Sequence, residues 1–297
     1  MSKIVIIGSS NVDLTVRTAH IPSKGETIFG HDLKMAFGGK GANQAVAVSR
    51  LGGDVSFITK VGTDSYGNMM AENLVKEGME AETVIRDSET PSGVAWICVD
   101  DNGDNSIIVM PGANGTMTVE DLAPYLSIIK EADYLLMQLE TPLDVVSHAA
   151  SVAYDNNVKV VLNPAPAQHL PDDLLSKTYI LTPNEKECRV LCGGSASEDE
   201  RSNAEYLLAK GVQNVIVTLG ENGSLLCNSD GCVSIPAVKV EAVDTVAAGD
   251  TYNGALCVAL SEGKSMTESM QFATKASAIA VTRFGAQPSV PYRTEIQ

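Results

Sequence analysis

Short apolar runs alternate with helical patterns along most of the chain. The runs KIVIIG, VSFIT, YLLMQ, VKVVLN, YILT and NVIVTLG are rich in β-branched residues and have no polar face, as expected of strands that are covered on both sides. Between them, segments such as GANQAVAVSRLG and residues 65–77 have the spacing of helices. This alternation predicts a three-layer α/β fold with a mostly parallel central sheet and helices on both faces.

The last third of the chain adds a hairpin and two more helices. The segment SLLCNSDGCVSI has two apolar arms and predicts a turn at Asp230 and Gly231. Two helical patterns follow, at about residues 250–262 and 266–283.

Two regions interrupt the alternation, at about residues 12–37 and 93–110. The second contains AWICVDDNGDNSIIVM, which predicts a hairpin with the turn DDNGDN. Together they predict a small antiparallel sheet that projects from the main domain as a lid or a dimer contact. No repeat or linker divides the chain, so residues 1–297 are expected to form one domain.

Composition narrows the class of protein. With 297 residues, 44% of them apolar and 20% charged, the chain can bury a large core. No stretch approaches the roughly 18 apolar residues that span a bilayer, and no signal-peptide pattern is visible, so a cytoplasmic location is expected. The formal charge of −16 and the lack of a basic stripe argue against nucleic-acid and membrane partners. An anionic ligand must therefore be held by local groups.

The cysteines show no CxxC pair and no nearby histidine at metal-ligand spacing, and a chain of this length needs no disulfides. We expect all six to be reduced packing residues: Cys98, Cys188, Cys192, Cys227, Cys232 and Cys257.

The segment DTVAAGDTYNGA, residues 244–255, contains the most informative chemistry. A glycine-hinged turn brings Asp250 to a predicted helix start, where unpaired backbone N–H groups can bind a phosphate. A carboxylate beside that phosphate could deprotonate an alcohol, so the segment indicates phosphoryl transfer with Asp250 as the base. Taken alone, a GD pair before a helix favours a simple N-cap role for Asp250, and only its combination with the other motifs favours the base.

The segment FGGKGANQ, residues 37–44, places three glycines and a lysine before a helix. The glycines let the backbone approach a ligand closely, with Lys40 and Asn43 directed at it. The spacing matches neither GxxxxGK[ST] nor GxGxxG, and a purely structural turn is the alternative.

Polar residues at other strand ends suit a polyol and a nucleotide. Asn11 and Asp13 follow the first strand, and Glu140 ends YLLMQLE, at the edge where ligands of open α/β sheets bind. Turn, cap and solvent roles are the alternatives. In TPNEKE, Asn184 and Glu187 suit a hydrated magnesium or, alternatively, an N-cap with a first-turn glutamate. The TLGENG turn can pass under a nucleotide.

The two signatures FGGKGANQAVAVSRLGG and DTVAAGDTYNGA resemble the PfkB-type carbohydrate kinases. Other motifs of the family occur in the same order along the chain: GSSNVD before the first signature, MQLETP, NPAPA, TPNEKE and TLGENG between the two, and AVTRFGAQPSVP after the second. The resemblance extends over nearly the whole chain. It implies a catalytic base at Asp250 with an anion turn at Ala247, Ala248 and Gly249. It implies sugar binding by Asn11, Asp13, Gly39, Lys40, Asn43, Glu140 and Asp250. It implies ATP binding by Asn184, Thr218, Gly220, Gly223, Gly249 and Thr274.

The resemblance also implies two metal ions. Magnesium would be associated with Glu187, and potassium would bind Asp244, Val246, Ala280, Arg283, Gly285 and Ser289, partly through main-chain oxygens. The family usually has DTxGAGD, whereas this chain has Ala247 at the glycine position, a change common among the family's ribose kinases.

The implied reaction is the transfer of a phosphoryl group from ATP to the 5-hydroxyl of D-ribose. The alternative is another sugar, such as 2-deoxyribose or fructose, or a nucleoside. A noncatalytic sugar sensor would be expected to have lost the base or the anion turn, and the missing GxGxxG counts against a nicotinamide-dependent oxidoreductase. A homodimer through the lid sheet is expected, because its strands would otherwise leave an apolar face uncovered.

Overall fold

The central sheet has nine strands in the order β13-β12-β11-β10-β9-β8-β1-β4-β5 among residues 3–296, which the computed structural model describes. The seven strands from β5 to β11 pair in parallel, and β12 and β13 add an antiparallel hairpin at one edge. The bounds are β1 Lys3–Ile7, β4 Asp54–Gly62, β5 Val84–Asp87, β8 Tyr134–Met137, β9 Lys159–Leu162, β10 Ile180–Leu181, β11 Asn214–Thr218, β12 Ser224–Asn228 and β13 Gly231–Ile235.

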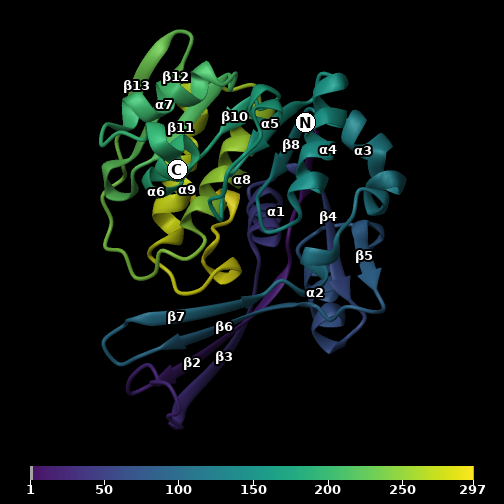
Figure 1. Ribbon diagram of the computed structural model, residues 1–297, viewed down its shortest axis with the longest axis vertical. Coiled ribbons are helices and arrows are strands. Elements are labelled where there is room, and N and C mark those ends of the chain that lie inside the picture. Colours follow the sequence, from purple (N-terminus) through teal and green to yellow (C-terminus); the bar gives the residue numbers. More distant parts are fainter. Residues whose placement is uncertain (1–2, 297) are drawn as a thin grey trace.

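Helices cover both faces of this sheet, as Figure 1 shows. The first strand explains why: Ile4 and Ile6 belong to one core cluster, and Val5 and Ile7 belong to the other, because successive side chains of a strand point to opposite faces. The α-helices are α1 Lys40–Arg50, α2 Ser65–Lys76, α3 Leu126–Lys130, α4 Leu143–Asp155, α5 Asp172–Ser176, α6 Glu185–Cys192, α7 Glu200–Ala209, α8 Ala248–Ser261 and α9 Met266–Ala280.

The first core cluster contains α1, α2, α8 and α9, and the second contains α3 to α7. Short 3-10 helices complete the connections: η1 Ala81–Thr83, η2 Gly112–Thr116, η3 Glu120–Tyr125, η4 Gly193–Ser195, η5 Gly220–Asn222, η6 Gln287–Ser289 and η7 Arg293–Glu295. The three-layer α/β fold predicted from the sequence is confirmed.

A second, four-stranded sheet projects from the main body and lies below it in Figure 1. We call it the lid sheet; it consists of β2 Asn11–Thr18, β3 Gly30–Gly38, β6 Gly93–Val99 and β7 Asn105–Met110, in the order β3-β2-β6-β7. The two outer pairs are antiparallel, while the central pair of β2 and β6 is parallel. The two segments that interrupted the alternation therefore form this sheet together.

Three sequence-based details are corrected. The β12–β13 turn lies at Ser229 and Asp230, and Gly231 is already the first residue of β13. The last helix ends at Ala280, three residues before the predicted end, since the chain turns there toward Asp244. The third difference is the oxidation state of two cysteines.

Cys227 and Cys232 form a disulfide, so the prediction that all six cysteines are reduced was wrong for this pair. The two-residue turn places them directly opposite each other on β12 and β13, with their Cα atoms 4.2 Å apart. The other four cysteines are free, and three of them are buried. Within residues 3–296, no helix has the length and apolar content needed to cross a membrane.

Candidate active site

The candidate site lies at the carboxyl ends of the parallel strands. β1 sits between β4 and β8, so successive connections leave it in opposite directions and open a crevice at that point. The residues at these strand ends or in the segments that follow them include Ser9, Asn11, Gln138, Glu140, Asn163, Thr182, Asn184 and Thr218. The predicted polyol and nucleotide residues from different loops therefore share one edge of the sheet.

Asp250 occupies the first turn of α8 and is only 5% exposed. It does not cap the helix: the N-cap position belongs to Ala247, which has a left-handed backbone with φ 58°. Instead, Oδ2 of Asp250 accepts a hydrogen bond from Asn43 Nδ2 at 2.9 Å, and Oδ1 accepts one from Gln44 Nε2 at 3.0 Å. The N-cap alternative for Asp250 is excluded, and its carboxylate is held in a fixed orientation.

Close packing of α1 on α8 makes these contacts possible. At Gly254 a Cβ atom would lie 2.6 Å from Ala47 Cβ and 2.9 Å from the Gln44 carbonyl oxygen, so only glycine allows this approach. At the start of α1, Gly39 has φ 87° and would, with a Cβ, meet the Asn11 nitrogen at 2.9 Å. Glycines thus bring the first-strand loop, α1 and α8 together.

Acidic groups cluster around Asp250. Burial, followed by the negative charges of Glu140 and Asp250, raises the pKa of Asp13 to about 7. The charge of Asp250, and also those of Glu140 and Glu187, raises the pKa of Lys40, against the effect of its burial. Lys40 is thus the cation within a group of four carboxyl groups, and the sequence-predicted sugar residues do converge.

Hydrogen bonds orient the side chains that are predicted to bind a polyol. Glu140 Oε2 accepts from Ser9 Oγ at 2.5 Å and from the Lys40 backbone N–H at 2.9 Å. Asn114 Nδ2 donates to Asn11 Oδ1 at 2.8 Å, which leaves the amide nitrogen of Asn11 as the donor for a ligand. Oδ1 of Asn43 is buried without a hydrogen-bond partner among the described residues, which is a natural place for a ligand hydroxyl.

The predicted nucleotide loops lie farther along the same edge. Asn184 and Glu187 form a capping box at the start of α6, with both reciprocal hydrogen bonds at 2.8 Å. The alternative prediction, an N-cap at Asn184 with a first-turn glutamate, is therefore confirmed. This capping box uses only Oε2 of Glu187. Thr218 pairs with Asn184 as an isolated bridge. The turn from Gly220 to Gly223 follows it directly, and both glycines have positive φ.

Thr274 lies on α9 and donates its hydroxyl to the Met270 carbonyl oxygen at 2.9 Å. That hydroxyl is therefore already occupied within its own helix.

Backbone contacts bring the two halves of the predicted cation loop together. Val243 N and Asp244 N both donate to the Val281 carbonyl oxygen, at 2.7 and 3.1 Å. The Asp244 carboxylate accepts from Val246 N and Gly285 N, each at 2.9 Å. The hydrogen bonds of this loop thus involve one carboxylate and backbone groups, which is not the ligand set of a transition metal. Consistently, residues 3–296 contain no group of three or more His, Cys, Asp or Glu side chains suited to a metal.

Several buried polar residues that support the site were not singled out from the sequence. They are Ser9, Gln44, Asn114, Gln138, Asn163, Thr182 and Asn253. One available signal was their position, since most of them directly follow a strand or stand at a helix start in a quoted motif.

The chain matches known proteins over nearly its whole length. The family model for pfkB family carbohydrate kinases matches residues 1–293. The ribokinase of Haemophilus influenzae is 42% identical over 294 residues, which is 98% of this chain and 96% of that protein.

The chain is also similar to solved structures over nearly its whole length. The ribokinase of Thermotoga maritima has a TM-score of 0.94 and 41% identity, covering 100% of this chain and 98% of that chain. The ribokinase of Arabidopsis thaliana, solved with ribose and ATP, has a TM-score of 0.92 and 32% identity, covering 99% of this chain and 97% of that chain. With its fold, its converging site and these relatives, this chain belongs to the pfkB family of carbohydrate kinases.

Proposed function

We propose that this protein is a kinase that transfers the γ-phosphoryl group of ATP to the 5-hydroxyl of D-ribose. The observation that carries the proposal is the buried carboxylate of Asp250, oriented by two amides at the start of α8 and surrounded by the predicted sugar-binding residues. The similarity to ribokinases over nearly the full chain supports ribose as the sugar.

In the proposed mechanism Asp250 accepts the proton of the attacking hydroxyl. Its fixed orientation matters more than unusual basicity, because much of the rate in phosphoryl transfer comes from positioning and charge stabilisation. The sugar is held by Asn11, Asp13, Asn43 and Glu140 between the lid sheet and the start of α1. The left-handed Ala247 begins α8, and the N–H groups of its first turn would bind the transferred phosphoryl group; among them, Ala248 N also donates to the Thr245 carbonyl oxygen at 3.3 Å.

Two cations complete the proposal. Magnesium would neutralise phosphate charge, and Glu187 would contact its hydration shell through the oxygen that the capping box leaves unused. Potassium would be held by Asp244 and Ser289 together with main-chain oxygens of Val246, Ala280, Arg283 and Gly285, where it would keep the loop that precedes α8 in place. We place this ATP-dependent reaction in the cytoplasm.

A sugar panel tests the assignment. ADP release with MgATP is measured with ribose, 2-deoxyribose, fructose and a nucleoside, each with and without potassium. We expect the highest kcat/KM with ribose, and we expect potassium to increase the rate of ADP release. Turnover of fructose or a nucleoside without turnover of ribose would reject ribose as substrate and retain the kinase.

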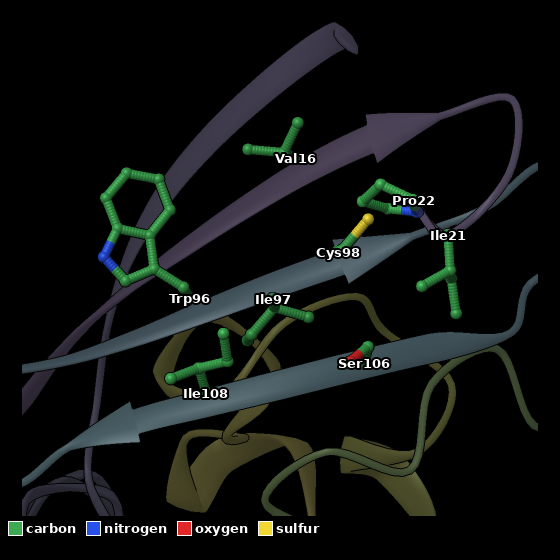
Figure 2. Close-up of a pocket in the computed structure, with 8 residues that line it drawn as sticks. All are labelled: Val16, Ile21, Pro22, Trp96, Ile97, Cys98, Ser106 and Ile108. Carbon is green, nitrogen blue, oxygen red and sulfur yellow. The ribbon is translucent and has the colours of Figure 1, made fainter. Parts of the chain in front are cut away.

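We also propose that two copies associate through the outer face of the lid sheet. Residues directly opposite each other on neighbouring strands share a face, and the pairs Met35–Leu14, Leu14–Trp96 and Trp96–Ile108 define an apolar one. Met35, Trp96 and Ile108 are 46%, 45% and 65% exposed. Figure 2 shows the pocket on this sheet, lined by Val16, Ile21, Pro22, Trp96, Ile97, Cys98, Ser106 and Ile108.

Sedimentation at micromolar concentration tests the dimer. The wild type is expected to sediment as a dimer and Trp96→Glu as a monomer, because a charge on the apolar face disfavours its burial. Tyr154→Glu is the control, since Tyr154 is 50% exposed on α4, away from the lid sheet. A monomeric wild type would contradict this part of the proposal.

A further inference from the structure

A continuous chain of buried hydrogen bonds runs behind Asp250. Gln44 Nε2 donates to Asp250 Oδ1 at 3.0 Å and to Asn163 Oδ1 at 3.1 Å. Asn163 Nδ2 donates to the Thr182 carbonyl oxygen at 3.2 Å. Thr182 Oγ1 donates to Asn253 Oδ1 at 2.6 Å, and Asn253 Nδ2 donates to the Gly249 carbonyl oxygen at 2.8 Å. The chain starts at the carboxylate of Asp250 and returns to the turn just before it.

Gln44 is the branch point of this network, and its side chain has every polar group engaged. Its two amide hydrogens are used by Asp250 and Asn163, and its Oε1 accepts from Gln138 Nε2 at 2.5 Å. The amide can therefore be placed in only one orientation, because the flipped amide would turn its oxygen toward the Asp250 carboxylate.

Gln44 is also fully buried, at 0% exposure, whereas the neighbouring Asn43 has an unpartnered Oδ1. With 0% exposure, the Gln44 side chain offers no surface for direct contact with a ligand. Gln44 can therefore affect the reaction only through its hydrogen-bond partners. Among these partners, Asp250 is the proposed base.

We infer that Gln44 is a positioning residue for the phosphoryl-transfer step. It fixes the position of the Asp250 carboxylate relative to the anion turn of α8. The base and the phosphoryl group are thereby held at a constant distance and orientation. This inference rests on the proposed function, because it assigns Gln44 a role in the same reaction.

Two variants separate positioning from packing. Gln44→Met has a similar length but cannot donate to Asp250. Gln44→Glu retains the shape and replaces the donor with a carboxylate that faces Asp250. Asn203→Met is the matched control, since Asn203 is an equally buried amide on α7, hydrogen-bonded to the loop at Ser197. Folding is checked by circular dichroism and thermal melting.

The expected result is a loss of kcat with binding retained. In Gln44→Met kcat should fall by about 10- to 100-fold, the range that a small misplacement of a reacting group produces. The KM values for sugar and ATP should change by less than about threefold, because ground-state contacts are intact. Gln44→Glu should lose more kcat than Gln44→Met, and Asn203→Met should retain kcat.

Three results would overturn the inference: kcat within about twofold of wild type in both variants, a rise in KM without a fall in kcat, or loss of folding in both variants, which would make Gln44 a structural residue. The sugar that the wild type turns over fastest is used throughout. A wild type that prefers another sugar would therefore reject ribose without deciding the role of Gln44.

Discussion

At the scale of single residues, the charge on Asp13 is the most consequential feature. Its pKa, raised to about 7 by burial and by the charges of Glu140 and Asp250, lies well above the ordinary aspartate value of 3.8. The unfolded chain loses this proton near pH 4, while the folded protein keeps it until about pH 7. The folded state therefore loses stability from this group as the pH rises through that window.

Asp13→Asn should consequently raise the melting temperature of the ligand-free protein, and by more at pH 8 than at pH 5. Thermal melts of both proteins at the two pH values measure this. An equal gain at both pH values, or a loss at pH 8, would show that Asp13 carries no such penalty. Sugar binding by the variant should be weaker.

Ala247 gives a second test at this scale. A non-glycine residue in the left-handed region costs roughly 1–2 kcal/mol, which glycine avoids, while glycine in the unfolded chain has more freedom to lose. Ala247→Gly should therefore leave the free energy of unfolding unchanged or raise it by up to about 1 kcal/mol. Ala71→Gly, within α2, should instead lower it by about 1 kcal/mol. Urea titrations of both variants measure the free energy of unfolding. Equal destabilisation of the two would show that the left-handed backbone at Ala247 is not strained.

At the scale of elements, the site depends on how closely α1 approaches α8. Gly254→Ala places a methyl group 2.6 Å from Ala47 Cβ, so the helices must separate. We expect a loss of about 1–3 kcal/mol in stability and a fall in kcat, because Asn43 and Gln44 move away from Asp250. Urea titration and steady-state kinetics measure the two effects.

Gly194→Ala is the control, since a Cβ at Gly194 meets nothing within 4 Å. Unchanged kinetics in Gly254→Ala would mean that the helix crossing does not set the geometry of the base.

The same elements explain what could be predicted from the sequence. Apolar runs and helical spacing identify strands and helices directly, so the layers and the sheet edge follow from local patterns. The role of Gln44 could not be predicted that way, because its partners Asn163 and Asp250 lie 119 and 206 residues away in the chain. The Cys227–Cys232 disulfide was missed because it depends on strand register: with the turn predicted one residue later, at Asp230 and Gly231, Cys227 would lie opposite Ser234 instead of Cys232.

At the scale of the whole molecule, the chain combines a net charge of −16 with a site for a polyanion. We propose that local groups hold the polyanion: the first turn of α8, the side chain of Lys40 and a cation at the loop around Asp244. The lid sheet, which projects from the same edge, supplies Asp13 from one face and presents apolar side chains on the other. The proposed sugar site and the proposed dimer would thus use opposite faces of one sheet.

The proposed role of Asp250 as the base of a sugar kinase can be tested by replacing it with asparagine. Ribose-dependent ADP release is compared between the wild type and Asp250→Asn, with ribose and ATP binding to both proteins followed by calorimetry. Because asparagine has nearly the same shape but cannot accept the proton, the account predicts loss of at least about 1,000-fold in kcat with both ligands still bound. Near-normal turnover by Asp250→Asn would contradict it.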